Sequence, residues 1–372
     1  MGASPGIPSP HRCVDAPAAP SITLASGCHN PQVKIDKLTT TNAFVIIDLE
    51  DASQAAGVVR AAPKVLQGSS KALARTATYT FAVRELQVSG ASAGISADPE
   101  ERVDAIAAFV TEVAPRVESG ELVLDPGGGV EPGDLAELAG KDRRDPVHAE
   151  MVDGVPLMLR LDAVGAAVAA ETALGGLENK SAAVEIGPSA GPLVAELTAR
   201  GAKVVAFGGS KGVAHDSAGL DTDALASGDD AVLDQLGGEL QPAESLLTTD
   251  ASVLFCGSRQ GMIDGEAAES LGAGLVVPTG CQPVSAKGLA VLRRRDVVAL
   301  ADFVSTAGRT FAGWPAGESA PEAIIADASA GIAAIVRDTL SHDEGAFLGA
   351  CHVAEAFLST WQDPLPFGRP LA

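Results

Sequence analysis

The sequence predicts an α/β protein with two domains, of which the second is a doubly wound parallel sheet. Three observations support this prediction. The chain has 372 residues, long enough for two cores, and 46% of them are hydrophobic. Short apolar runs alternate with helical stretches along its second half. These runs end in glycines, the pattern typical of strand–helix–strand units.

The elements of the first half follow from hydrophobic periodicity. A continuous apolar run predicts a buried strand, strict alternation predicts a half-exposed strand, and an apolar stripe at i, i+3 and i+4 predicts a helix. The expected elements are a flexible arm over 1–38, a buried strand at 42–49, a helix within 66–78, a half-exposed strand at 81–88, a glycine-rich loop at 89–95, a helix at 99–117 and a strand at 122–124.

The second half repeats a simpler pattern. The expected elements are a helix at 162–174, a strand-turn-helix-turn-strand unit at 182–212, buried strands at 252–255, 274–277 and 297–300, crossover segments at 265–270 and 286–294, and helices at 321–340 and 347–361. We therefore expect domains at 39–158 and 159–320, with helices from 321–372 packing back on the first.

The unit at 182–212 is the candidate nucleotide site of this Rossmann-like domain. A turn after such a strand presents backbone N–H groups at a helix N-terminus, where the helix dipole favours an anion such as a pyrophosphate. A dinucleotide loop has three glycines, however, and this turn has only two. The pattern leaves open a nucleotide site or an ordinary connection. The candidate contacts in the turn are Gly187, Ser189, Ala190 and Gly191.

Charge and cysteine usage exclude several classes of function. The formal net charge of −22 opposes binding to nucleic acid or to anionic membranes. Five scattered cysteines without a CxxC pair fit a reducing compartment, and the histidines lack metal-ligand spacing. No apolar run approaches 18 residues. We expect a cytoplasmic protein that binds a small molecule, without a metal, nucleic acid or membrane partner.

Asp125 is the candidate catalytic acid of the first half. It follows the strand at 122–124 and precedes the run 126–129, Pro-Gly-Gly-Gly. An acid at the carboxyl end of a strand lies at the sheet edge where ligands bind. A helix-capping or turn aspartate is the alternative.

Several segments resemble one family, the Glu/Leu/Phe/Val amino-acid dehydrogenases, and most of all its leucine, valine and phenylalanine branch. The resemblance extends from 42 to 352 and implies a substrate and dimerisation domain, a dinucleotide-binding domain, a homo-oligomer and NAD or NADP as cofactor. The segments are GVVR, LARTATYTFAVREL, GASAGISAD, LVLDPGGG, LTARGAKVVAFGGSKG, VLFCGSRQGMID, VVPTGCQP and VVALADFVSTAGRTFAGW.

The family's reaction is reversible oxidative deamination, in which hydride passes between an amino acid and a nicotinamide. One lysine holds the substrate carboxylate, a second activates water, and an aspartate moves protons. By resemblance these roles fall on Thr80, Ser92 and Asp125. Thr80 carries no positive charge, and Ser92 cannot act as a base near pH 7. General base catalysis contributes about 10²- to 10⁴-fold, so deamination should be very slow. Arg84 is an alternative carboxylate ligand, although alternation favours a solvated position.

The cofactor side departs from the family as well. Ile186 replaces the first glycine of the loop, and Pro188 stiffens it. The acid that binds the adenosine ribose falls on Gly209, while the adjacent Ser210 and Lys211 suit a 2′-phosphate or an ordinary turn.

The residues expected near the nicotinamide differ too. Asparagines of the family fall on Cys281 and Thr306, and Cys256 begins the Cys-Gly-Ser that replaces a small apolar stretch. Cys281 is either a nucleophile or, as its surroundings favour, an inert buried thiol. Two hypotheses follow: a divergent NAD(P)-dependent oxidoreductase for an amino acid, imine or related small substrate, and a non-catalytic relative with a regulatory, ligand-sensing or partner-subunit role.

Overall fold

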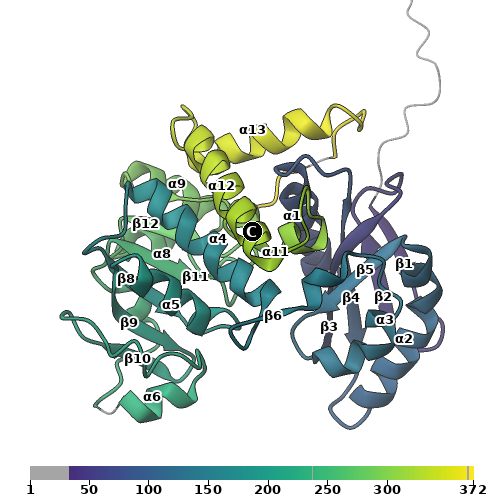
Figure 1. Ribbon diagram of the computed structural model, residues 1–372, viewed down its shortest axis with the longest axis horizontal. Coiled ribbons are helices and arrows are strands. Elements are labelled where there is room, and N and C mark those ends of the chain that lie inside the picture. The colour runs from purple at the N-terminus through teal and green to yellow at the C-terminus, as the bar shows by residue number, and fades with distance from the viewer. Residues whose placement is uncertain (1–32, 237, 367) are drawn as a thin grey trace, which may run out of the picture.

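Two sheets organise the protein, one in each half of the chain. The computed structural model describes residues 33–236, 238–366 and 368–372 (Figure 1). The first sheet lies on the right of Figure 1 and the second on the left, with helices of the second half between and above them. A mixed sheet in one half and a mainly parallel sheet in the other make this an α/β protein, as predicted.

The first sheet has five strands in the order β1-β2-β4-β3-β5. Strands β4, β3 and β5 are parallel, and β1 and β2 run antiparallel at one edge. The strands are β1 (Lys34–Lys37), β2 (Ala43–Ile47), β3 (Ala55–Ala62), β4 (Ser89–Ser96) and β5 (Leu122–Pro126). The expected strands at 42–49 and 122–124 are confirmed. The arm is shorter than expected because 34–37 form β1, and residues 1–32 lie outside the described residues.

Two helices cover opposite faces of this sheet. Side chains alternate along β2, so Phe44 and Ile46 pack against Ala74 of α1 (Gln67–Ala82), while Val45 and Ile47 join the core beneath α2 (Arg102–Ser119). Both helices were expected. Val103, placed by periodicity in the buried stripe of α2, is 74% exposed.

Two predictions around α1 are wrong. The expected strand at 81–88 is the end of α1 and a turn, and the expected loop at 89–95 is β4, buried at the centre of the sheet. Glycine is required in β4 because α1 lies directly on the strand. A Cβ at Gly90 would stand 1.8 Å from the backbone oxygen of Ala74. Close helix packing, not flexibility, therefore explains Gly90, while Gly94 makes room for the side chains of Phe44 and Val65.

The second sheet has the order β10-β9-β8-β11-β12-β13, parallel except at β10. The chain starts at β8, winds outward to β9, then returns to β11 on the other side, so the order reverses between β8 and β11. The strands are β8 (Ser181–Glu185), β9 (Lys203–Gly209), β10 (Gly212–His215), β11 (Val253–Cys256), β12 (Leu275–Pro278) and β13 (Val298–Ala299). This is the predicted Rossmann-like topology.

Helices surround the second sheet and reach the first. Helix α4 packs against α5, α11 and α12, and α13 packs against both α12 and α1. The longer helices are α4 (Leu157–Leu174), α5 (Ala190–Ala199), α9 (Ala286–Arg294), α12 (Pro321–Leu340) and α13 (Ala346–Leu358). Among the described residues no helix is both long and apolar enough to cross a membrane.

Short elements complete the fold. They are α3 (Ala136–Ala139), β6 (Met151–Val152), β7 (Val155–Pro156), α6 (Ala231–Leu236), α7 (Ser245–Thr248), α8 (Gly265–Ser270), α10 (Asp302–Ser305) and α11 (Gly308–Gly313).

Several side-chain hydrogen bonds join helix α1 to the second half. Gln282, in the loop after β12, donates from Nε2 to Thr76 Oγ1 at 2.9 Å and to the backbone oxygen of Ala72 at 3.2 Å. The hydroxyl of Tyr79 donates to Glu355 Oε1 on α13 at 3.1 Å, and Arg369 bonds both oxygens of Glu355. One wall of the first domain is therefore fixed to the C-terminal part of the chain.

Candidate functional site

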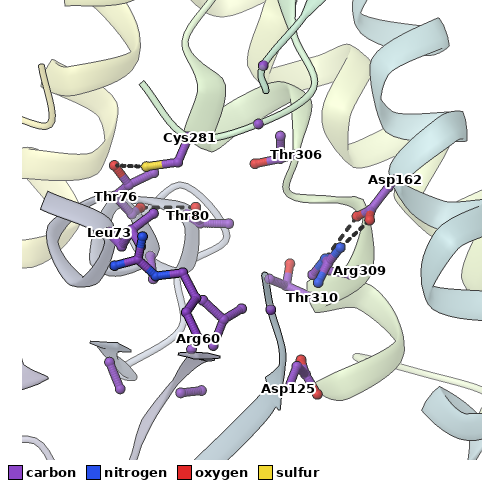
Figure 2. A pocket seen from close by; sticks show the side chains of 18 of the residues that line it. Arg60, Leu73, Thr76, Thr80, Asp125, Asp162, Cys281, Thr306, Arg309 and Thr310 are labelled. Carbon is purple, nitrogen blue, oxygen red and sulfur yellow. Dashed lines mark hydrogen bonds and ion pairs between the residues drawn. The ribbon is translucent and has the colours of Figure 1, made fainter. Parts of the chain in front are cut away.

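A cavity of about 840 Å³ lies between the two halves (Figure 2). The first half contributes the carboxyl ends of β3 and β5 and one side of α1. The second half contributes α4, α11 and the loops after β11 and β12. Parallel strands of both sheets therefore direct their carboxyl ends at one space, which is where α/β sheets bind ligands.

Four of the predicted site residues line this cavity. Thr80, Asp125, Cys281 and Thr306 come from α1, β5 and two loops of the second half, and Figure 2 shows them around one space. The others are not among its lining residues. They are Ser92, Arg84, Cys256, Gly187, Ser189, Ala190, Gly191, Ser210 and Lys211.

Asp125 is held by a buried arginine that the sequence analysis missed. Arg144 Nη2 donates to Asp125 Oδ1 at 2.6 Å, and its Nη1 donates to Oδ2 at 3.1 Å. The same guanidinium bonds Asp142 at 2.7 and 2.9 Å. Burial disfavours the charge of Arg144, whose side chain is 5% exposed, but the two carboxylates outweigh burial and raise its pKa. Both oxygens of Asp125 are thus engaged in a bidentate ion pair.

A second ion pair lines the cavity beside the first. Arg309 bonds Asp162 of α4 through Nε at 3.0 Å and through Nη2 (Figure 2). The carboxylate of Asp162 raises the pKa of Arg309 despite the burial of the guanidinium. This pair joins α4 to α11, so it holds the wall of the cavity as well as lining it.

The hydroxyl and thiol side chains next to α1 are satisfied by their neighbours. Thr80 Oγ1 donates to the backbone oxygen of Thr76 at 3.0 Å, so its hydroxyl is hydrogen-bonded within its own helix. The thiol of Cys281 donates to Thr76 Oγ1 at 3.3 Å. Thr306 Oγ1 donates to the backbone oxygen of Asp302 at 2.8 Å.

Cys281 has the properties of an inert thiol. Burial, together with the nearby carboxylate of Asp302, raises its pKa to about 12. The thiolate is the nucleophilic form, so the group is unreactive at neutral pH. We expect iodoacetamide to label Cys281 at least about 100-fold more slowly than N-acetylcysteine at pH 8.5. Peptide mass spectrometry measures the rate, and labelling as fast as the free thiol would contradict the buried position.

Ser92 and Arg84 lie away from the chemistry assigned to them. Ser92 is fully buried in β4, on the face covered by α1, and its Oγ has no hydrogen-bond partner within the described ranges. Arg84 follows α1, where its guanidinium carbon lies 3.5 Å from the ring centroid of Phe311 and Nη1 donates to Thr310 Oγ1 at 3.3 Å. Burial lowers the pKa of Arg84 to about 10. The expected solvated position of Arg84 is wrong because the expected strand is absent.

The turn after β8 starts α5 in close contact with a later segment. Gly191 has to be glycine because a Cβ there would stand 2.1 Å from the backbone oxygen of Ala226. A Cβ at Gly187 would meet only open space. Ser189 precedes α5 without a side-chain capping bond, and the N–H of Ala190 bonds the oxygen of Gly187 at 2.9 Å.

Glu185, at the end of β8, is a second residue that the sequence analysis missed. Its carboxylate accepts N–H bonds from Gly257 at 2.7 Å and Ser258 at 3.0 Å, and an O–H bond from Ser258 at 2.5 Å. These donors lie at the end of β11, across the point where the strand order reverses. Burial raises the pKa of the adjacent Cys256 thiol far above its ordinary value. An internal carboxylate therefore occupies the donors at the switch point.

Comparison with known proteins agrees with this architecture. Residues 163–311 match the family described as Glutamate/Leucine/Phenylalanine/Valine dehydrogenase. The matched residues extend from α4 to α11 and include the second sheet. The chain is 28% identical to NADP-specific glutamate dehydrogenase A1 of Halobacterium salinarum, over 68% of this chain and 66% of that one. It is 27% identical to NAD-specific glutamate dehydrogenase A of the same organism, over 68% and 63%. The chain thus spans just under two thirds of the length of each.

Solved structures show the same fold at low sequence identity. A hetero-hexameric glutamate dehydrogenase from Thermus thermophilus in its leucine-bound form has a TM-score of 0.71 at 20% identity, over 86% of this chain and 83% of that one. L-tryptophan dehydrogenase from Nostoc punctiforme has a TM-score of 0.59 at 15% identity, over 88% and 96%. The curated relatives are glutamate dehydrogenases, not members of the leucine, valine and phenylalanine branch that the sequence favoured.

The residues at the nucleotide turn do not fit a dinucleotide in the manner of these dehydrogenases. A Cβ at Gly209 would stand 3.3 Å from Ile186 Cβ and 3.4 Å from Asp230 Oδ1. Asp230 Oδ1 is buried without a hydrogen-bond partner in the described part of the chain. Asp230 thus brings a carboxylate from another segment to the place where the resemblance expects the ribose acid, and Ile186 lies beside it. Ser210 and Lys211 are exposed in the β9–β10 turn.

One group of histidines does come together, although the sequence spacing predicted no metal. Among the described residues, ligand atoms of His342, Glu344 and His352 lie within 4.8 Å of one another. His352 Nε2 lies 2.7 Å from Glu344 Oε2, closer than the roughly 3.3 Å that separates two ligands of one zinc ion. This contact is an exposed hydrogen-bonded pair.

Proposed function

We propose that this protein is a non-catalytic relative of the amino-acid dehydrogenases that binds a small ligand between its two halves. The observation that carries the proposal is the state of Asp125. This aspartate is the remaining one of the three groups that resemblance assigns to deamination, and Arg144 engages both of its oxygens. The pair uses one acceptor site on each oxygen and fixes the carboxylate on Arg144, so a substrate nitrogen would have to share an oxygen that already accepts a charged hydrogen bond.

The replaced lysines support the same conclusion. Thr80 lines the cavity but donates its hydroxyl proton to its own helix, and it brings no charge to a carboxylate. Ser92 is buried under α1 and is not among the cavity's lining residues. Neither residue supplies a base that activates water, so the protein lacks the means to hydrolyse an imine at a useful rate.

The cofactor side supports it independently. Glu185 places a carboxylate at the end of β8, where a dinucleotide would bring its pyrophosphate. Like charges at short range disfavour binding in a site of low dielectric. Pro188 also removes one N–H donor from the turn. We therefore assign no step to NAD or NADP.

Such a protein would act as a regulatory, ligand-sensing or partner subunit. The Thermus thermophilus relative is described as a hetero-hexamer in a leucine-bound form, so this fold occurs in assemblies of unlike chains with a bound amino acid. We propose that the protein forms an oligomer, either with copies of itself or with an active dehydrogenase chain.

A divergent NAD(P)-dependent oxidoreductase is the second candidate. The observation that favours it is the cavity itself, which is lined by both halves and still contains Asp125. Reduction of a preformed imine needs no activated water, so this reaction would tolerate the loss of the second lysine.

Cofactor titration separates the two candidates. We expect neither NADH nor NADPH to change its fluorescence or to shift the melting temperature of the pure protein. A ligand at 100 times its dissociation constant would add about 2.7 kcal/mol to the stability of the folded state, which melting detects easily. Oxidation of NADPH with a panel of 2-oxo acids plus ammonia, or with preformed imines, would contradict the first candidate and support the second.

A further inference from the structure

Arg60 is a cation of the cavity without a carboxylate partner within 4.0 Å among the described residues. Its Nη2 donates to Ser70 Oγ at 2.9 Å, and its Nε is buried without a hydrogen-bond partner in the same set of residues. Arg144 and Arg309, by contrast, are each paired with an aspartate. Burial lowers the pKa of Arg60, because the charged guanidinium is partly removed from water.

Arg60 projects from β3 into the cavity. Val58 of β3 lies opposite Asp125 of β5, and Arg60 is two residues farther along β3, so Arg60 and Asp125 project from the same face of the sheet. The aliphatic part of Arg60 packs on Gly127, where a Cβ would stand 3.0 Å from Arg60 Cγ. Figure 2 shows the guanidinium directed toward Leu73 and Thr76 at the upper end of the cavity, away from Asp125.

A carboxylate fits this position better than other anions. The planar guanidinium presents parallel N–H donors that match the two oxygens of a carboxylate. Asp125 and Asp162 line the same cavity, so a dianion such as a phosphate would meet about twice the repulsion that a single negative charge meets. Apolar side chains complete the wall and suit an aliphatic or aromatic remainder. They include Leu73, Phe81, Met158 and Trp314.

We propose that Arg60 binds the carboxylate of a small monocarboxylate, an amino acid or a 2-oxo acid, and thereby takes the place of the positive charge that Thr80 lacks. This inference rests on the proposed function only in that the cavity holds a small ligand. It does not depend on whether the protein transfers hydride.

The test uses matched pairs of charged and neutral ligands at constant ionic strength. The full-length protein is titrated with butyrate, L-leucine and 4-methyl-2-oxopentanoate, and with butyramide and L-leucinamide as counterparts that lack the carboxylate. Melting temperature and calorimetry measure binding. We expect saturable binding of at least one carboxylate and none of the amides. Stronger binding of leucine or of the oxo acid identifies which source the cavity prefers.

Variants assign the binding to Arg60. We expect R60M to abolish the shift and R60K to weaken binding about tenfold, because lysine keeps the charge but loses the fork. R143M is the control, since Arg143 is exposed and is not among the lining residues of the cavity, so its replacement should leave binding intact. A cooperative melting transition of ligand-free R60M, close to that of the wild type, verifies that the variant folds. If R60M does not fold, R60Q replaces it in the same titrations.

Several outcomes would overturn the assignment. They are binding of no carboxylate, equal binding of the amides, and unchanged binding by R60M. Equal losses in R60M and R143M would indicate a general charge effect instead. Binding through Arg60 together with NADPH oxidation would support the carboxylate site and refute the non-catalytic proposal. Failure of the site and failure of the proposed function therefore give different results.

Discussion

Replacement of Arg144 by methionine should destabilise the protein by about 3–5 kcal/mol, because it leaves the carboxylates of Asp125 and Asp142 without their shared buried partner. Urea unfolding at neutral pH measures the loss. The size of the effect follows from burial: the Arg144 side chain is 5% exposed, so solvent does not compensate for the missing guanidinium.

Two further variants separate the ion pair from simple loss of volume. R60M removes a cation with no acidic partner and should change the free energy of unfolding by less than about 1 kcal/mol. The double variant R144M/D125N should be less destabilised than the sum of its two single variants, since each removes a charge that the other leaves unpaired. Equal losses in R60M and R144M, or full additivity, would show that Arg144 does not act through Asp125.

Gly90→Ala should be the second large effect, with a loss of about 3 kcal/mol or more. The added Cβ would stand 1.8 Å from the backbone oxygen of Ala74 and 2.5 Å from the backbone nitrogen of Thr78, so helix α1 would have to move off β4. Backbone atoms cannot rotate away as a flexible side chain can. The same displacement would shift Thr76 and Thr80 in the cavity, so carboxylate binding should fall with stability.

Gly68 provides the matched control in the same helix. A Cβ there would meet no atom within 4 Å, and Gly68→Ala should stabilise the protein by about 0.5–1 kcal/mol, because alanine has the higher helix propensity. Equal effects of the two substitutions would mean that α1 does not rest on β4 as described.

The sequence predicted those parts of the fold that depend on local pattern. Ala43–Ile47 is a continuous apolar run, and it forms a strand covered on both faces. Strand β4 was missed because its glycines indicate a loop, whereas tertiary packing against α1 makes glycine necessary at Gly90. The expected strand at 81–88 failed for the related reason that α1 continues to Ala82.

In the candidate site, too, the sequence predicted what depends on local pattern and missed what depends on tertiary packing. Asp125 could be placed at a sheet edge because a strand and a glycine run bracket it. Its pairing with Arg144, 19 residues later, follows from tertiary packing that no spacing encodes. Glu185 had a signal, since it directly precedes the nucleotide turn, but its partners at Gly257 and Ser258 lie on another strand. Asp230 reaches Gly209 only through the folded segment after β10.

The bonds of α1 to Gln282 and to Glu355 have a consequence for how ligands enter and leave. A helix that belongs to the first half by sequence is tied to the second half at its middle and near its C-terminal end. A simple hinge between the halves would have to break these bonds or carry α1 with it. Ligand exchange should therefore depend on movement of the other cavity walls, the strand ends of β3 and β5. Removing the last residues of the chain, which include Arg369, should weaken the attachment of α1 to the second half.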